Sequence, residues 1–127
     1  MEFSLDFGGF PQDLTITLRG VADALGARRL ATDLAADPRF RPGLLILVDV
    51  TDLDTATVDD NELYADATAF IERDAAAAPG AVAIVAPDGD TFIKATHYRA
   101  YLGGSKSRRE VFIDREDAIA WLRSQRR

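Results

Sequence analysis

The stretch LLILVDV, residues 44 to 50, decides the fold. It is a short, unbroken apolar run that includes β-branched residues, and Gly43 comes immediately before it. A run of this length and composition indicates a strand that is buried on both faces. AVAIVA, residues 81 to 86, repeats the pattern directly after Pro79 and Gly80. Two such strands predict a largely parallel sheet with helices on its faces.

The N-terminal segment alternates between apolar and polar residues. Apolar side chains occupy every second position from Phe3 to Phe7 and again from Leu14 to Leu18. A period of two is typical of a half-buried strand. Gly8, Gly9 and Pro11 interrupt the alternation between the two runs. Two alternating strands joined by such a turn predict an antiparallel hairpin.

Four further segments carry apolar residues at helical spacing. Their apolar stripes are Ala27, Leu30, Ala31 and Leu34; Leu63, Ala67, Phe70 and Ile71; Phe92, Ala95, Tyr98 and Leu102; and Ala118, Trp121 and Leu122. Asp23 is the candidate N-cap of the first helix, either Asp88 or Asp90 that of the third, and Asp114 that of the last. Each cap would satisfy backbone N–H groups that the first helical turn leaves without a partner.

A short strand from Glu110 to Ile113 separates the third and fourth helices. The order of elements is therefore β, β, α, β, α, β, α, β, α. Strands that alternate with helices predict parallel pairing through right-handed crossovers. We expect an α/β fold for residues 1–127 as a single domain. Its mixed sheet should have about five strands, antiparallel only in the N-terminal hairpin, with about four helices around it.

Composition excludes several classes of function. The chain of 127 residues has 15 basic and 21 acidic side chains, a net charge of −6, which disfavours binding to nucleic acid. It has no cysteine and one histidine, His97, so disulfides, thiolate metal sites and multi-histidine sites within one chain are excluded. The N-terminus shows no leader pattern, and no apolar stretch is long enough to span a bilayer. We expect a cytoplasmic protein with no membrane insertion.

Four segments together resemble the small bacterial STAS-like proteins. They are the N-terminal hairpin, ADPRFRPGLLILVDV (36–50), AVAIVAP (81–87) and EVFIDREDAIAWL (110–122). That family has the SpoIIAA-like fold of anti-sigma-factor antagonists and is related in shape to CRAL-TRIO lipid-binding domains. The resemblance implies a mixed sheet flanked by helices, and it implies a switch or binding module that acts without catalysis.

The family's regulated serine lies in an Asp-Ser pair followed by Gly, in the loop after the strand that corresponds to Leu44–Val50. The present chain has Thr51 to Asp59 there, without serine or glycine, and Thr57 is the nearest hydroxyl by count. The phosphorylation switch therefore does not carry over. In the resembling family, partners dock on this loop and on the helix that follows it.

LVDVTDLDTATVDD, residues 47 to 60, places five aspartates and three threonines beyond a buried strand. Ligands of open α/β sheets collect at the carboxyl ends of parallel strands, so Asp49, Asp52 and Asp54 could hold magnesium or accept a phosphoryl group. Aspartate and threonine are also common in turns and helix caps, and Asp59 suits the start of the next helix. We favour the turn-and-cap interpretation.

Two other features have a functional and a structural interpretation. GGSKSRR, residues 103 to 109, is similar to half a P-loop, but it runs from helix to strand instead of strand to helix. Gly103 is therefore expected to end a helix, and Lys106, Arg108 and Arg109 leave a weak anion site open. His97 could act as a general base, but no serine lies in a nucleophile-elbow context. A solvated or partner-facing histidine is the favoured interpretation.

The sequence thus predicts a non-catalytic, cytoplasmic binding or regulatory module. A protein partner, with a basic surface favoured by the acidic loop, is the expected ligand. The alternative is a carrier of a small apolar or lipid-like ligand, and the third option is an enzyme or phosphoacceptor that uses the Asp-rich loop. We expect no cofactor, metal or catalytic residue, and a homodimer is left open. The candidate partner-binding residues are Asp52, Asp54, Thr57, Tyr64, His97, Tyr98 and Tyr101.

Overall fold

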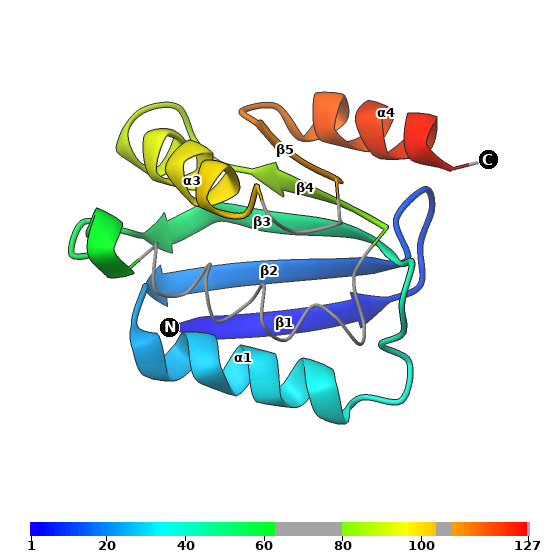
Figure 1. Ribbon diagram of the computed structural model, residues 1–127, viewed down its shortest axis with the longest axis horizontal. Helices are drawn as coiled ribbons and strands as arrows, with labels where there is room; N and C mark the ends of the chain where they lie inside the picture. Colours follow the sequence, from blue (N-terminus) through cyan, green and yellow to red (C-terminus); the bar gives the residue numbers. More distant parts are fainter. Residues whose placement is uncertain (63–79, 104–107, 127) are drawn as a thin grey trace.

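One five-stranded mixed sheet organises the protein (Figure 1). The computed structural model describes residues 1–62, 80–103 and 108–126. The strands lie in the order β1-β2-β3-β4-β5, with β1 and β2 antiparallel and every other neighbouring pair parallel. Their bounds are Glu2–Phe7, Leu14–Val21, Leu45–Asp54, Ala81–Val85 and Arg108–Phe112. The predicted fold class and strand pairing are confirmed.

Three helices are described in full: α1 (Ala24–Ala36), α3 (Asp90–Tyr101) and α4 (Arg115–Gln125). Residues 60–62 are also helical, and the rest of the predicted second helix lies outside the described residues. Among the described residues, no helix has both the length and the apolar character needed to cross a membrane.

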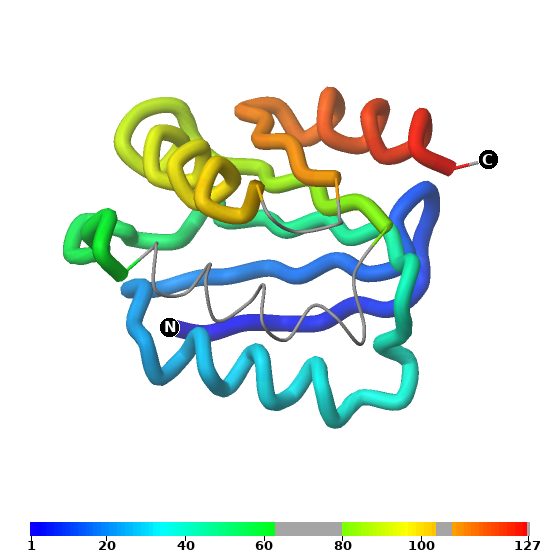
Figure 2. Tube along the Cα trace, in the orientation of Figure 1, coloured from blue at the N-terminus to red at the C-terminus, as the bar shows by residue number. Residues whose placement is uncertain are grey.

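The central strands β3 and β4 are buried on both faces, as the apolar runs predicted. One core cluster lies between the sheet and two helices, where Leu30 and Leu34 of α1 and Phe92 and Ala95 of α3 pack against it. The other cluster joins β3 and β4 to α4 through Ala118 and Leu122, which are fully buried. Figure 2 shows α1 along the β1–β2 side of the sheet and α4 along the β4–β5 side. Helices therefore cover both faces, and the buried strands need no polar face.

The first residues of β3 and β4 approach each other closely. A Cβ atom on Gly80 would lie 2.7 Å from the carbonyl oxygen of Gly43, so any larger residue would force these two segments apart. Gly43 itself has a φ of +85°, a backbone conformation that L side chains rarely adopt. The two glycines that flank the apolar runs are therefore required by close packing as well as by turn geometry.

β3 is longer than predicted, and the difference matters for the site. The sequence predicts a strand that ends at Val50, but the strand continues to Asp54. The pairing of β2 with β3 shifts where Leu18 faces two residues, Val50 and Thr51, which is a β-bulge. Beyond the bulge, Arg19 to Val21 still pair with Asp52 to Asp54. Asp52 and Asp54 therefore belong to a strand, and the prediction that they lie in a loop was wrong.

Two smaller predictions were also wrong. The fifth strand starts at Arg108, two residues earlier than predicted, because Arg108 and Arg109 pair with Ala81 and Val82. The N-cap of α3 is Gly89, with no side-chain cap, so neither Asp88 nor Asp90 has that role. Trp121 is partly buried and packs against the core cluster that contains its stripe neighbours Ala118 and Leu122. The caps Asp23 and Asp114 are confirmed, since each accepts a backbone N–H of its helix.

Candidate functional site

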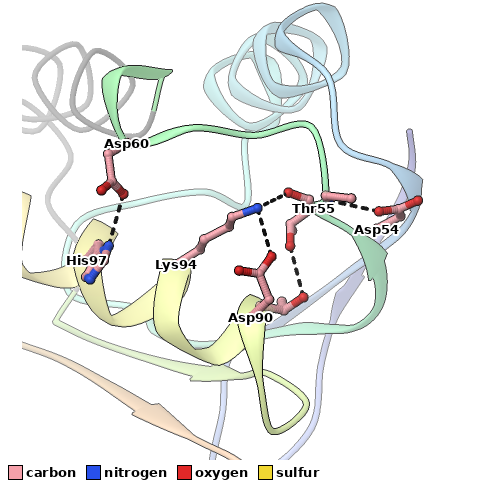
Figure 3. A network of polar contacts seen from close by, with 8 residues as sticks. Asp54, Thr55, Asp60, Asp90, Lys94 and His97 are labelled. Atoms are coloured by element: carbon pink, nitrogen blue, oxygen red, sulfur yellow. Dashed lines mark hydrogen bonds and ion pairs between the residues drawn. The ribbon is translucent and has the colours of Figure 1, made fainter.

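The candidate site lies at the carboxyl end of β3, where the chain leaves the sheet and passes the start of α3 (Figure 3). The carboxyl ends of parallel strands are the usual position for ligand sites in α/β sheets. Asp52 and Asp54 flank Leu53, which packs against the core, so alternation along the strand turns both carboxylates away from it. Both aspartates are exposed.

Several aspartates of this segment form turns and caps. The Asp54 carboxylate accepts the N–H of Ala56 at 2.9 Å, and the carbonyl of Thr55 accepts the N–H of Val58 at 3.0 Å. Asp59 accepts the N–H of Glu62 at 2.8 Å, at the start of the helical residues. These are the local bonds that aspartate makes in turns and at helix N-termini. The geometry supports the turn-and-cap interpretation for Asp54 and Asp59.

The segment after β3 is attached to α3 by side chains that the sequence did not single out. The Lys94 ammonium donates to the carbonyl of Thr55 and lies 2.9 Å from the carboxylate of Asp90. The hydroxyls of Thr55 and Thr91 are 2.9 Å apart. Figure 3 shows Lys94 between the two elements. The spacing of Asp90 and Lys94 by four residues was a visible signal for their ion pair, whereas no local pattern relates Thr55 to Thr91.

His97 lies within hydrogen-bonding distance of Asp60, with 3.0 Å between Nδ1 and the carboxylate. Their side chains are 45% and 58% exposed, so the pair lies at the surface (Figure 3). Asp49 is engaged elsewhere: it contacts Arg115 of α4 at 2.9 Å and accepts the N–H of Thr51. Asp49 and His97 are therefore held by different partners, Asp49 by α4 and His97 by Asp60.

Within residues 1–62, 80–103 and 108–126, no group of three histidine or acidic side chains is arranged to hold a metal ion. The described serines, Ser4 and Ser124, lie on β1 and near the end of α4, away from His97 on α3. Neither serine therefore lies next to His97 as the nucleophile of a catalytic triad would, with a third group to orient the histidine.

The remaining candidate residues divide into three groups. Thr57 is exposed in the turn after β3. Tyr98 and Tyr101 are partly buried on α3, and both interact with other groups of the protein. Tyr64 lies outside the described residues, as do Lys106 and the apolar stripe of the predicted second helix. Partial burial of the two tyrosines agrees with a role in covering the core as well as with a role at a partner surface.

The carboxyl edge of the sheet is strongly acidic. Its exposed acidic residues are Asp52, Asp54, Asp59, Asp60, Glu62, Asp88 and Asp90. Cations near this edge include Lys94, which is paired with Asp90, and Arg19, whose backbone pairs with that of Asp52. The N-terminal ammonium group of Met1 also lies at this end of the sheet and pairs with Asp23. Two exposed aliphatic side chains adjoin this edge: Val21, 53% exposed and opposite Asp54 in the sheet, and Ile93, 52% exposed in the first turn of α3. We call this combined surface the acidic edge.

An apolar ligand cavity finds little support around α3. Phe92, the aromatic residue that suggested a lipid-like ligand, packs against the core cluster together with Ala95. A groove of about 650 Å³ does exist, but it lies near the C-terminal end of α3, and four of its nine lining residues are charged.

The order and direction of the strands define a SpoIIAA-like, STAS-like α/β fold. A crystal structure of an uncharacterized protein of the DUF3478 family from Shewanella loihica PV-4, which has a SpoIIAA-like fold, is similar to this chain with a TM-score of 0.63. The match covers 95% of this chain and 92% of that chain at 18% sequence identity, a level at which the likeness concerns the fold. A scan against models of protein families and a search of curated proteins found no match.

Proposed function

We propose that this protein is a non-catalytic cytoplasmic binding module whose acidic edge docks a protein partner with a basic surface. The observation that carries the proposal is the concentration of exposed carboxylates beside Val21 and Ile93 at one edge of the sheet. Exposed aliphatic groups supply apolar contact area, and the surrounding charge accelerates encounter with a partner of opposite sign.

The attachment of the acidic edge to α3 supports the same proposal. Bonds from Lys94 and Thr91 hold Thr55, so the segment between β3 and the next helix has a defined conformation before any partner arrives. A preformed surface loses less conformational entropy on binding than one that must become ordered. The STAS-like fold is consistent with this role, because the better-understood proteins that the sequence resembles act as binding modules.

The test distinguishes the effect of charge at the acidic edge from the effect of the protein's net charge on the association rate. A partner is first captured from the native host with the immobilised protein, and its association rate is then measured at low salt with purified components. Asp52→Lys should lower the association rate by roughly threefold or more, since reversal of one charge at the docking surface weakens electrostatic steering. Asp52 suits this test better than Asp54, whose carboxylate holds the turn at Ala56.

Asp6→Lys is the matched control. Asp6 is also an exposed aspartate on a strand, but it lies on β1, at the end of the sheet away from Asp52. The control changes net charge by the same amount and should leave the association rate close to that of the wild type. Equal association rates for wild type, Asp52→Lys and Asp6→Lys would show that the partner docks elsewhere.

A further inference from the structure

A second surface with the opposite charge lies at the other end of the sheet. It is the groove of about 650 Å³ between the C-terminal end of α3, the start of β5 and the second half of α4. Its polar and aromatic lining comes from Arg99, Arg108, Arg109, Glu110, Trp121 and Gln125. Arg108 is the first residue of β5, so the groove lies near the amino end of that strand and away from the acidic edge. Its volume lies within the range of small-molecule sites.

Positive charge dominates the groove although the whole chain carries a net charge of −6. Among its described lining residues, three are arginines and one, Glu110, is acidic. Glu110 balances Arg99, with which it forms an ion pair, so the exposed Arg108 supplies the positive charge that favours an anion.

The arginines are held in place by the surrounding structure. Arg99 donates through Nη2 to Glu110 and through Nε to the carbonyl of Arg109, both at 2.7 Å. Arg109 is only 7% exposed, and Arg108 next to it is exposed. Arg109 interacts with other groups of the protein, and alternation along β5 turns its side chain to the opposite face of the sheet from that of Arg108. Arg108 adds a charge that a ligand can reach from solvent.

Trp121 adds a flat apolar surface to the same groove. Its indole packs against Phe112 with 5.9 Å between ring centroids, and it is partly buried. A partly exposed indole can contact a planar group of a ligand, while guanidinium groups bind carboxylate or phosphate oxygens through paired N–H donors.

We propose that the arginine groove binds a small organic anion, with its carboxylate or phosphate group at Arg108 and a planar apolar group against Trp121. This site is independent of the acidic edge and of the partner proposed there. Its ligand differs in sign from that partner, and it is a small molecule instead of a protein surface.

The protein contains its own reporter for this site, because Trp121 is its single tryptophan. Phenyl phosphate is the probe, titrated at constant ionic strength while tryptophan emission is recorded. We expect a saturable change in emission below about 10 mM phenyl phosphate. Inorganic phosphate, which lacks the ring, should bind more weakly, and benzyl alcohol, which lacks the charge, should produce no saturable change.

Arg108→Gln is the test variant and Arg123→Gln the matched control. Both arginines are exposed, so neither variant should impair folding, and Arg123 lies on α4 outside the groove lining. Arg108→Gln should weaken phenyl phosphate binding by about tenfold, the expected effect of losing a charge-assisted hydrogen bond. Arg123→Gln should bind as the wild type does. The proposal is overturned by the absence of saturation in the wild type, or by equal weakening in the two variants, which would indicate general screening by ions.

Discussion

Lys94 illustrates how a single residue shapes the candidate site. Its side chain is only 17% exposed, although lysine is rarely buried unless it has polar partners. The ammonium group bridges Thr55, at the end of β3, and Asp90, in the first turn of α3. Asp90 is 68% exposed, so solvent screens that ion pair, whereas the bond to the Thr55 carbonyl is partly buried.

These two contacts of Lys94 can be separated by mutation. Lys94→Met keeps the packing of the aliphatic stem but leaves the Thr55 carbonyl without its charged donor. We expect it to lower the free energy of unfolding by about 1–2 kcal/mol. Asp90→Asn removes only the screened ion pair and should change that energy by less than about 0.5 kcal/mol. Urea unfolding of both variants measures the difference, and equal losses would assign the effect to the ion pair instead.

At the scale of elements, α4 shows which part of a helical stripe contributes most to stability. Ala118 and Leu122 are fully buried against β3 and β4, whereas Trp121 lies at the margin of the cluster beside Phe112 and the arginine groove. The sequence places all three residues on one stripe. It does not reveal that Trp121 packs beside β5, which is an edge strand of five residues.

Two substitutions in α4 test this difference. Leu122→Ala should cost about 2–5 kcal/mol of unfolding free energy, because it leaves a cavity in a fully buried position. Trp121→Phe should cost clearly less, since the indole is partly exposed and phenylalanine retains the aromatic contact with Phe112. Chemical denaturation of the two variants gives both values. A larger loss for Trp121→Phe would mean that α4 is anchored at its tryptophan.

At the scale of the whole molecule, Asp13 and Arg126 join distant parts of the chain. Asp13 follows the turn of the N-terminal hairpin, and its carboxylate accepts the N–H of Leu45, at the start of β3, at 2.9 Å. Arg126, just beyond α4, donates to the same carboxylate at 2.8 Å and to the carbonyl of Pro11. Burial alone would raise the pKa of Asp13, but the bonds from Leu45 and Arg126 outweigh it and lower that pKa below 3.8.

A lowered pKa in the folded state makes Asp13 a source of stability that depends on pH. Its contribution is complete above the ordinary pKa of 3.8 and is lost as the pH falls through the lower folded value. Asp13→Asn should therefore be less stable than the wild type at neutral pH, with a smaller further loss on acidification below about pH 4. The stability of Arg126→Gln, which keeps the hydrogen bond from Leu45 to Asp13, should lie between that of the wild type and that of Asp13→Asn. Urea unfolding from pH 7 to pH 2.5 measures these stabilities. The prediction is contradicted if the wild type and Asp13→Asn lose the same unfolding free energy on acidification.

The elements of the fold could be predicted from local periodicity. Alternation specified the hairpin, two apolar runs specified the central strands, and helical spacing specified the helices, because burial of each pattern requires one type of element. Element ends were less accurate where pairing between strands decides them. The continuation of β3 to Asp54 depends on a bulge opposite Leu18 and on hydrogen bonds to β2, and neither is encoded in the local pattern.

The candidate site, too, could be predicted from the sequence only in part. The aspartate-rich run after a buried strand was enough to select Asp52 and Asp54 as candidates, and His97 was selected as the single histidine of the sequence. The contact of Thr55 with Thr91 joins residues 36 positions apart, and the contact of Asp13 with Arg126 joins residues 113 positions apart. The arginine groove likewise combines residues of α3, β5 and α4. Sequence patterns report which face of an element is buried, but only the tertiary structure decides which side chains meet, because such contacts depend on how whole elements pack against one another.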